Sequence, residues 1–221
     1  MAQRAGWSMT RLPFRDREDA GRRLAQALAA HRGQHPLVLA IPRGAVPMGR
    51  IIADALGGEL DVVLVRKIGA PHNPELALGA IDEHGSVHMN PEAAMFELPH
   101  RYIAEEARRQ LELIQSRRRS YGAAPIALRG RTVIVTDDGL ATGATMFAAL
   151  KAARAQHPAW LVCAVPVAAA ESLERVRVLA DEVVCLATPE PFLSVGQWYE
   201  EFAAVEDATV IQLLAARAST A

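Results

Sequence analysis

Short runs of apolar residues alternate along the chain with segments in which apolar residues recur every three or four positions. The five runs cover residues 37–41, 61–65, 132–136, 160–165 and 182–186. Their Val, Leu and Ile content is typical of strands that are buried on both faces. Helices are predicted over 46–56, 145–156 and 169–179, with an earlier one near 20–28 capped by Asp16 or Asp19. This alternation predicts an α/β fold with a doubly wound, mainly parallel five-stranded sheet and helices on both faces.

Residues 69–90 interrupt the alternation with several Pro and Gly residues. Residues 78–81 and 86–89 can pair there as a small hairpin, and a segment this long inside a compact domain is typical of a mobile, functional loop. Two helices are predicted next, over 91–98 and 99–121, and the second has one apolar face. We interpret residues 1–13 as a tail and 14–221 as a single domain that ends in an aromatic-rich stretch, 189–221.

Composition excludes several classes of function. The 221 residues carry a formal net charge of −1, and the densest basic run is Arg117, Arg118 and Arg119. One helical turn of arginines is usually a solvated face, so no nucleic-acid partner is predicted. No apolar run reaches membrane-spanning length, and no signal peptide is recognisable. Cys163 and Cys185 lie in apolar runs and are predicted to be buried thiols, which fits a cytoplasmic protein.

Two adjacent carboxylates, Asp137 and Asp138, directly follow the apolar run 132–136. In open α/β sheets, ligands bind beyond the carboxyl ends of the strands, and the N–H groups at the start of a helix attract an anion. Carboxylates suit the vicinal hydroxyls of a sugar, because they accept hydrogen bonds from both. The stretch 132–145 therefore predicts a site for ribose 5-phosphate. Its phosphate would bind the loop of small and hydroxyl residues Ala141, Thr142, Gly143, Ala144 and Thr145.

The alternative is an ordinary strand, turn and helix in which an aspartate caps the helix. Capping accounts for one acid, but not for two acids followed by a Gly- and Thr-containing loop. A Walker-type site is excluded because the stretch has no Gly-Lys-Ser/Thr, and a dinucleotide-binding fingerprint is also absent.

The stretch TVIVTDDGLATGAT resembles the phosphoribosyl-diphosphate signature of type I phosphoribosyltransferases. It departs from that pattern at Gly139 and Thr136, neither of which supplies a binding group. The order of the flanking elements is similar as well, over about residues 37–186. Uncharacterised bacterial phosphoribosyltransferase-like proteins with PRGAVP and DDGLATGAT sequences are similar to this chain. The resemblance implies the substrate 5-phosphoribosyl 1-diphosphate, a nitrogen acceptor such as a nucleobase, Mg²⁺, and release of pyrophosphate.

The loop after the first strand, with Pro42, Arg43 and Gly44, holds pyrophosphate in the resembled family, often across a strained peptide. Gly44 permits the backbone to approach and Arg43 supplies charge. Arg66 and Lys67 are predicted to end the second strand on the same rim. Because side chains alternate along a strand, we assign Lys67 to the ligand, with Arg66 as the alternative. Taken alone, the loop would be an ordinary strand-to-helix turn with a surface arginine. For one of Arg66 and Lys67, a positive strand end that faces solvent is the alternative.

The resemblance also implies roles for the remaining candidates. Asp137 and Asp138 fix the ribose hydroxyls and favour a cationic sugar in the transition state, while Arg43 and Lys67 stabilise the leaving group. No residue is assigned as a direct metal ligand, since Mg²⁺ would bind mainly through the diphosphate, or through a water on either aspartate. In the segment 69–85, His72 or Glu75 could act on the acceptor, although each is equally well explained as a solvated loop residue.

Two rival functions remain open. One is a non-catalytic regulator that binds phosphoribosyl diphosphate or a nucleotide, since a fold and a motif do not fix an activity. The other is a different reaction on a phosphosugar, such as hydrolysis or phosphorolysis. The acceptor itself is not indicated by the sequence, although 189–221 resembles the small hood that binds it in the family. The apolar face of helix 99–121 and the C-terminal aromatic residues are candidate interfaces for a homodimer.

Overall fold

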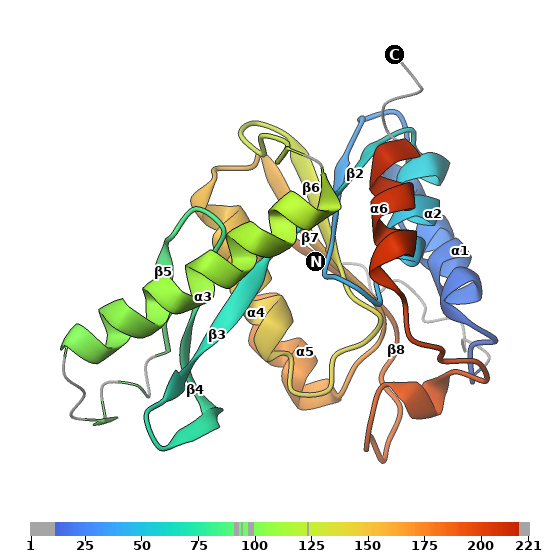
Figure 1. The fold of residues 1–221 in the computed structure, drawn as a ribbon. Coiled ribbons are helices and arrows are strands. Elements are labelled where there is room, and N and C mark those ends of the chain that lie inside the picture. The colour runs from blue at the N-terminus through green and yellow to red at the C-terminus, as the bar shows by residue number, and fades with distance from the viewer. Residues whose placement is uncertain (1–11, 91–92, 94, 97–99, 123, 217–221) are drawn as a thin grey trace.

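A computed structural model describes residues 12–90, 93, 95–96, 100–122 and 124–216. Its centre is a five-stranded parallel sheet with the strand order β2-β1-β6-β7-β8 (Figure 1). The strands are β1 (Leu37–Ala40), β2 (Glu59–Val62), β6 (Thr132–Thr136), β7 (Trp160–Val167) and β8 (Glu182–Ala187). The five-stranded parallel sheet and the doubly wound α/β class are therefore confirmed, although the second strand covers 59–62 and not 61–65.

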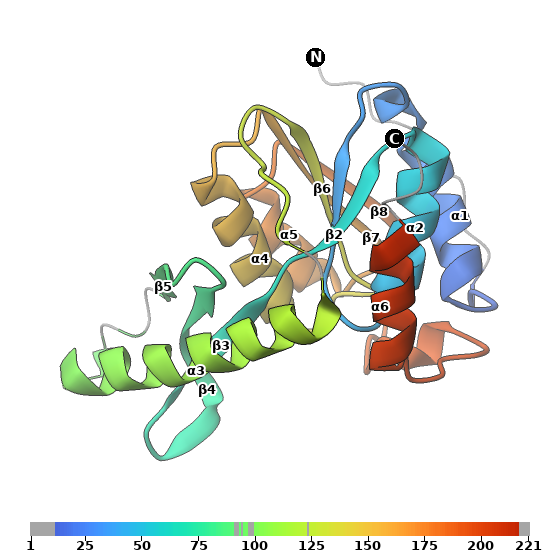
Figure 2. The same ribbon diagram turned by 45° about the horizontal axis from the view of Figure 1, so that its top comes forward.

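The helices cover both faces of this sheet (Figures 1 and 2). The first face carries α1 (Arg17–Ala27), α2 (Val46–Leu56) and α6 (Asp207–Ala215), and the second carries α4 (Ala144–Ala155) and α5 (Ala170–Arg177). Side chains alternate between two separate cores, because neighbouring residues of a strand point to opposite faces. Val38 packs among the residues of the first core, whereas Leu37 and Leu39 belong to the second.

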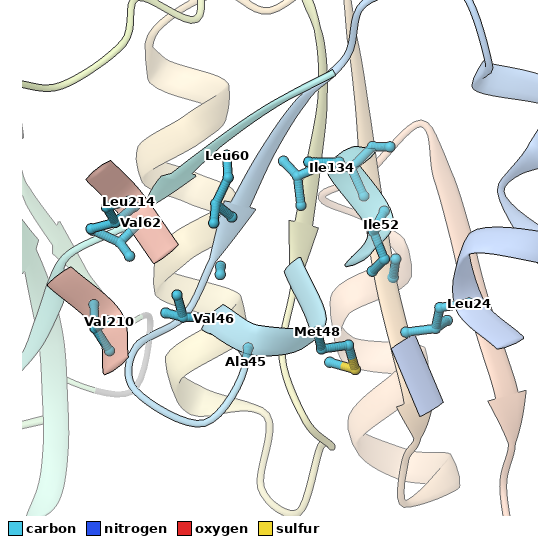
Figure 3. Close-up of a cluster of buried hydrophobic side chains, with 14 of the residues drawn as sticks. Leu24, Ala45, Val46, Met48, Ile52, Leu60, Val62, Ile134, Val210 and Leu214 are labelled. Carbon is cyan, nitrogen blue, oxygen red and sulfur yellow. The ribbon is translucent and has the colours of Figure 1, made fainter. Parts of the chain in front are cut away.

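The first core joins parts of the chain that are far apart in sequence. Leu24 of α1, Ile52 of α2 and Ile134 of β6 meet there with Val210 and Leu214 of α6 (Figure 3). Helix α6 is thus packed on the same face of the sheet as α1. Cys163 in β7 and Cys185 in β8 are free and buried, as predicted.

A second, antiparallel sheet extends away from the first and consists of β3 (Val65–Ala70), β4 (Asn73–Asp82) and β5 (Val87–Met89). The predicted hairpin is confirmed, since β4 pairs with β5. Two expectations are corrected. Residues 69–90 form mostly strands rather than a long loop, and Arg66 and Lys67 do not end the second strand. That strand ends at Val62, and both residues belong to β3.

The long helix α3 (His100–Tyr121) packs against the second sheet. Near its end, the Arg118 guanidinium donates to Asp61 of β2 at 2.8 Å, to Glu83 at 2.7 and 2.8 Å and to the Val62 carbonyl at 3.0 Å. This cluster ties the helix to the point where the chain leaves the parallel sheet. Most of the helix predicted over 91–98 and most of the predicted tail lie outside the described residues. None of the helices in the described ranges is long and apolar enough to cross a membrane.

Candidate functional site

The two adjacent aspartates lie immediately beyond the end of β6, and an arginine from a distant helix contacts one of them. Asp138 Oδ2 accepts hydrogen bonds from Arg17 Nε at 3.0 Å and from Arg17 Nη2 at 2.9 Å. The Asp138 N–H donates to Asp137 Oδ1 at 2.9 Å. Only 12% of the Arg17 side chain and 17% of the Asp138 side chain are exposed, so the ion pair is largely shielded from solvent. Sequence analysis found both acids and missed Arg17.

The environment makes the two carboxyl groups unequal. Burial raises the pKa of Asp137 well above its ordinary value, and the negative charge of Asp138 raises it further. Burial also raises the pKa of Asp138, but Arg17 opposes that rise through its charge and its hydrogen bonds. Two neighbouring carboxylates disfavour ionisation of both at once. Because only Asp138 is paired with Arg17, the negative charge is more favourable on Asp138 than on Asp137.

The C-terminal segment holds Arg17 in place. Arg17 Nη1 donates to the Ala203 carbonyl at 2.6 Å, and the guanidinium lies 3.8 Å from the centroid of the Phe202 ring. The Tyr199 hydroxyl donates to the Asp138 carbonyl at 2.6 Å. The segment is itself fixed by an isolated bridge between Tyr199 and Phe14. Tyr199 therefore contacts Asp138, and Phe202 contacts the arginine that pairs with it. The predicted contact of the C-terminal aromatic residues with an acceptor stays a prediction.

The loop that follows β1 packs directly against the acid pair. Strand ends β1 and β6 are neighbours, because Ala40 pairs with Thr136 and the Ile41 N–H donates to the Thr136 carbonyl at 3.0 Å. The peptide bond between Pro42 and Arg43 is cis. A Cβ atom on residue 44 would overlap Asp138 Oδ2 and lie 3.4 Å from Arg17 Nε. Glycine is needed here for space beside the carboxylate.

Replacing Gly44 with Ala is therefore expected to displace the Asp138 carboxylate from Arg17. Overpacking of this kind costs about 1–3 kcal/mol of unfolding free energy, which thermal or denaturant unfolding will measure. An alanine at Gly44 that leaves stability unchanged would contradict the described packing.

The predicted phosphate loop forms the start of α4. Gly143 precedes this helix with φ = 72°, a left-handed conformation that favours glycine. The Ser172 hydroxyl of α5 donates to the Ala141 carbonyl and fixes the loop from the side. Thr142, Ala144 and Thr145 line a cavity of about 340 Å³. The loop thus exposes helix N–H groups and two threonines to a space that is large enough for an anion.

Lys67 and Arg66 are adjacent on β3, and both border the cavity beside the phosphate loop. Lys67 pairs with Ala80, which pairs with His88, and all three line the 340 Å³ cavity beside the phosphate loop. Arg66 donates to Gln110 Oε1 of α3 at 2.5 Å and also borders a second cavity of about 300 Å³. The structure therefore places Lys67 beside the phosphate loop, whereas the sequence assigned it to the pyrophosphate with Arg43, whose cavity it does not line. Its role toward the diphosphate stays a prediction.

The second cavity is basic and adjoins the loop after β1. Pro42 and Arg43 line it together with Arg66 and Arg117. Asp207, in the first turn of α6, lies 2.8 Å from Arg117 and 3.8 Å from Arg43. The predicted pyrophosphate residues Arg43 and Arg66 are thus brought together, whereas Gly44 faces the acid pair.

The two loop candidates remain apart from these cavities. His72 is exposed in the turn between β3 and β4 and lines neither of them, while the side chain of Glu75 lies outside the described part of the structure. Their proposed roles toward an acceptor stay predictions. In the described ranges, no group of three or more His, Cys, Asp or Glu residues is arranged to hold a metal ion.

Comparison with known proteins gives consistent matches. The family model for the phosphoribosyl transferase domain matches residues 14–196 of this chain. Two curated Mycobacterium tuberculosis proteins, "Putative phosphoribosyl transferase Rv0571c" and MT0597, are 43% identical over 210 residues, which is 91% of this chain and 46% of theirs. The chain thus spans about half the length of these relatives. The crystal structure of TT1426 from Thermus thermophilus is 44% identical, with a TM-score of 0.85 over 93% of this chain and 99% of that one.

Proposed function

Since this chain belongs to the phosphoribosyltransferase family, we propose that it transfers the 5-phosphoribosyl group from 5-phosphoribosyl 1-diphosphate to a nitrogen acceptor and releases pyrophosphate. One observation carries this proposal. Three chemically different groups lie at the neighbouring carboxyl ends of β1 and β6. A basic loop follows β1, and a carboxylate pair and a helix start with hydroxyl groups follow β6. In doubly wound sheets this switch point is where ligands bind.

The carboxylate pair would hold the ribose. Arg17 donates both hydrogen bonds to Oδ2 of Asp138, and no hydrogen bond to Oδ1 of Asp138 is found among the described residues. That oxygen and the Asp137 carboxylate would accept hydrogen bonds from the two ribose hydroxyls. Their negative field would favour the positive charge that develops at C1 as the bond to the diphosphate breaks.

The phosphate groups would bind on either side of the ribose. The N–H groups at the start of α4, with the hydroxyls of Thr142 and Thr145, suit the 5-phosphate. Arg43 and Arg66 border the cavity on the other side and suit the diphosphate, since arginine forms paired hydrogen bonds with phosphate oxygens. Binding at two remote points would orient C1 toward the acceptor without taking part in bond making.

Magnesium fits the donor set of this site. Mg²⁺ usually takes one or two carboxylates together with substrate phosphates and water, and Asp137 and Asp138 offer such carboxylates. When bound, the ion would neutralise charge on the diphosphate leaving group. Arg17 already neutralises Asp138 in part, so we expect the metal to reach these acids through water or on the Asp137 side.

A pyrophosphate-release assay tests the proposal. The purified chain is incubated with Mg²⁺, 5-phosphoribosyl 1-diphosphate and each common purine or pyrimidine base in turn. We expect release that depends on both the donor and one class of acceptor. Release with the donor alone would instead indicate hydrolysis. Tight donor binding in calorimetry, without turnover in the presence of any nitrogen acceptor, would support the regulator and contradict the transferase.

A further inference from the structure

The cavity at the start of α4 is larger and more basic than one phosphate group requires. Its volume of about 340 Å³ falls in the range of about 300–1,000 Å³ that is typical of sites for whole small ligands. Four cationic side chains line it, and none of the described residues in its lining is Asp or Glu. The cations are Arg66, Lys67, Lys151 and Arg175. A single phosphate monoester carries about −1.5 to −2 charge at pH 7, so this cavity has cations beyond those that a 5-phosphate can engage.

Lys151 extends the phosphate loop along α4. Thr145, Ala148 and Lys151 follow at a spacing of three residues and all line the cavity, which places them on one side of the helix. Lys151 lies six residues beyond Thr145, or about 9 Å along the axis. Side chains on a helix tilt toward its N-terminus, so the lysine extends back toward the loop. Its Nζ lies 4.6 Å from the centroid of the Phe147 ring, which forms the apolar part of the wall.

Arg175 reaches the same cavity from α5. The Ser172 hydroxyl binds the Ala141 carbonyl, and Ser172 Cβ would lie 3.3 Å from a Cβ on Gly143. These contacts show that α5 abuts the phosphate loop. Arg175 comes one turn after Ser172 on that side of the helix. The second sheet completes the cavity with Lys67 and His88, and the His88 imidazole is held by Asp82 at 3.2 Å.

We propose that this cavity binds the distal phosphates of a nucleoside 5′-diphosphate or 5′-triphosphate, with Lys151 and Arg175 as the residues that recognise them. The proposal rests on the proposed function, because that function places the ribose at Asp137 and the first phosphate at Thr142 and Thr145. The β- and γ-phosphates then continue along α4, away from the acid pair. A nucleotide bound in this way occupies the ribose site and competes with 5-phosphoribosyl 1-diphosphate.

Calorimetric titration with two nucleotide series tests this assignment. The mono-, di- and triphosphates of adenosine and of uridine are titrated into the full chain without divalent metal, and ribose 5-phosphate serves as the base-free reference. In the unmodified protein, affinity is expected to rise at least about tenfold from mono- to triphosphate, because each added phosphate gains charge-assisted contacts with Lys151 and Arg175. Lys151→Ala and Arg175→Ala should each remove most of that rise and leave ribose 5-phosphate binding unchanged.

Arg177→Ala is the matched control. Arg177 lies on the same helix as Arg175 and pairs with Glu174, but it does not line this cavity, so its variant should retain the full dependence on phosphate number. Equal affinity for mono-, di- and triphosphates would overturn the inference, as would an undiminished rise in the Lys151 and Arg175 variants. Binding of ribose 5-phosphate in those cases would leave the proposed function intact. Failure of ribose 5-phosphate and of every nucleotide to bind would reject both.

Discussion

A chain carrying Asp137→Asn together with Asp138→Asn is expected to lose binding of 5-phosphoribosyl 1-diphosphate while remaining folded. An amide accepts a weaker hydrogen bond from a ribose hydroxyl than a carboxylate does, and each charge-assisted bond is worth about 1.5–3 kcal/mol. Loss of two such bonds lowers affinity by about 100- to 20,000-fold. Calorimetry with the donor and Mg²⁺ measures the effect. Unchanged donor affinity in the double variant would reject the assignment of this site.

The single variant Asp137→Asn separates a binding role from a structural role. Burial and the charge of Asp138 raise the pKa of Asp137, so ionisation is less favourable in the folded chain than in the unfolded one. The resulting cost to stability is present above the raised pKa and absent below the ordinary value of 3.8. An asparagine keeps an oxygen for the Asp138 N–H and carries no charge.

The free energy of unfolding at pH 7 is therefore expected to rise in Asp137→Asn, while donor affinity falls. At a pH below the ordinary carboxyl value the two proteins should become similar in stability, because Asp137 is then largely protonated in both the folded and the unfolded chain. Thermal unfolding at the two pH values measures this difference. A residue that serves the fold would show the opposite result, with lower stability at pH 7 and unchanged donor binding.

Local sequence patterns predict those parts of the site whose chemistry is contiguous in the chain. Asp137, Asp138 and the loop to Thr145 follow one strand, so a single strand, loop and helix start positions them together. The same holds for Pro42, Arg43 and Gly44 after β1. A parallel sheet then brings these two loops to one edge, since β1 and β6 are neighbours. Hydrophobic periodicity predicted the strands that these loops follow, whereas the role of the loop after β1 came from the resemblance to the family.

The second strand shows why a continuous apolar run can mislead. Residues 61–65 are all apolar after Asp61 and predict one strand, yet β2 ends at Val62 and β3 begins at Val65. Val63 and Leu64 are buried between the two sheets, so burial persists while the strand direction changes. Periodicity reports burial and cannot distinguish a straight strand from a bend inside the core. The roles of Arg66 and Lys67 depended on this boundary.

Arg17 could not be predicted because its partner lies 121 residues away. In sequence it belongs to the polar start of a helix, where arginine is common. Its role follows from three long-range contacts, with Asp138, with the Ala203 carbonyl and with the Phe202 ring. The register between Phe14 and Tyr199 brings these contacts together, and no local pattern encodes that register.

Replacing Arg17 with Gln is expected to destabilise the protein and to change the pH dependence of donor binding. The largely buried Asp138 carboxylate would lose both guanidinium hydrogen bonds. Removing one partner of such a pair costs about 2–4 kcal/mol of unfolding free energy near neutral pH. The loss should shrink at pH values where Asp138 is protonated, because the ion pair is then absent from the unmodified protein as well. Only the contacts with the Ala203 carbonyl and the Phe202 ring are still lost there.

The pH profile of donor affinity tests whether Arg17 acts on the acids or only on the fold. Arg17 opposes the rise in the pKa of Asp138, so its removal raises that pKa further, and the pH at which donor affinity is lost moves upward. Arg22→Gln is the control on the same helix. Arg22 makes an exposed pair with Glu18, and its loss should change stability by less than about 0.5 kcal/mol and leave the profile in place.

In a double-mutant cycle, Arg17→Gln should cost little in a chain that already carries Asp138→Asn, because the charge that the guanidinium neutralises is gone. Additive losses and an unshifted profile would show that Arg17 stabilises the C-terminal segment without controlling the ionisation of the acid pair.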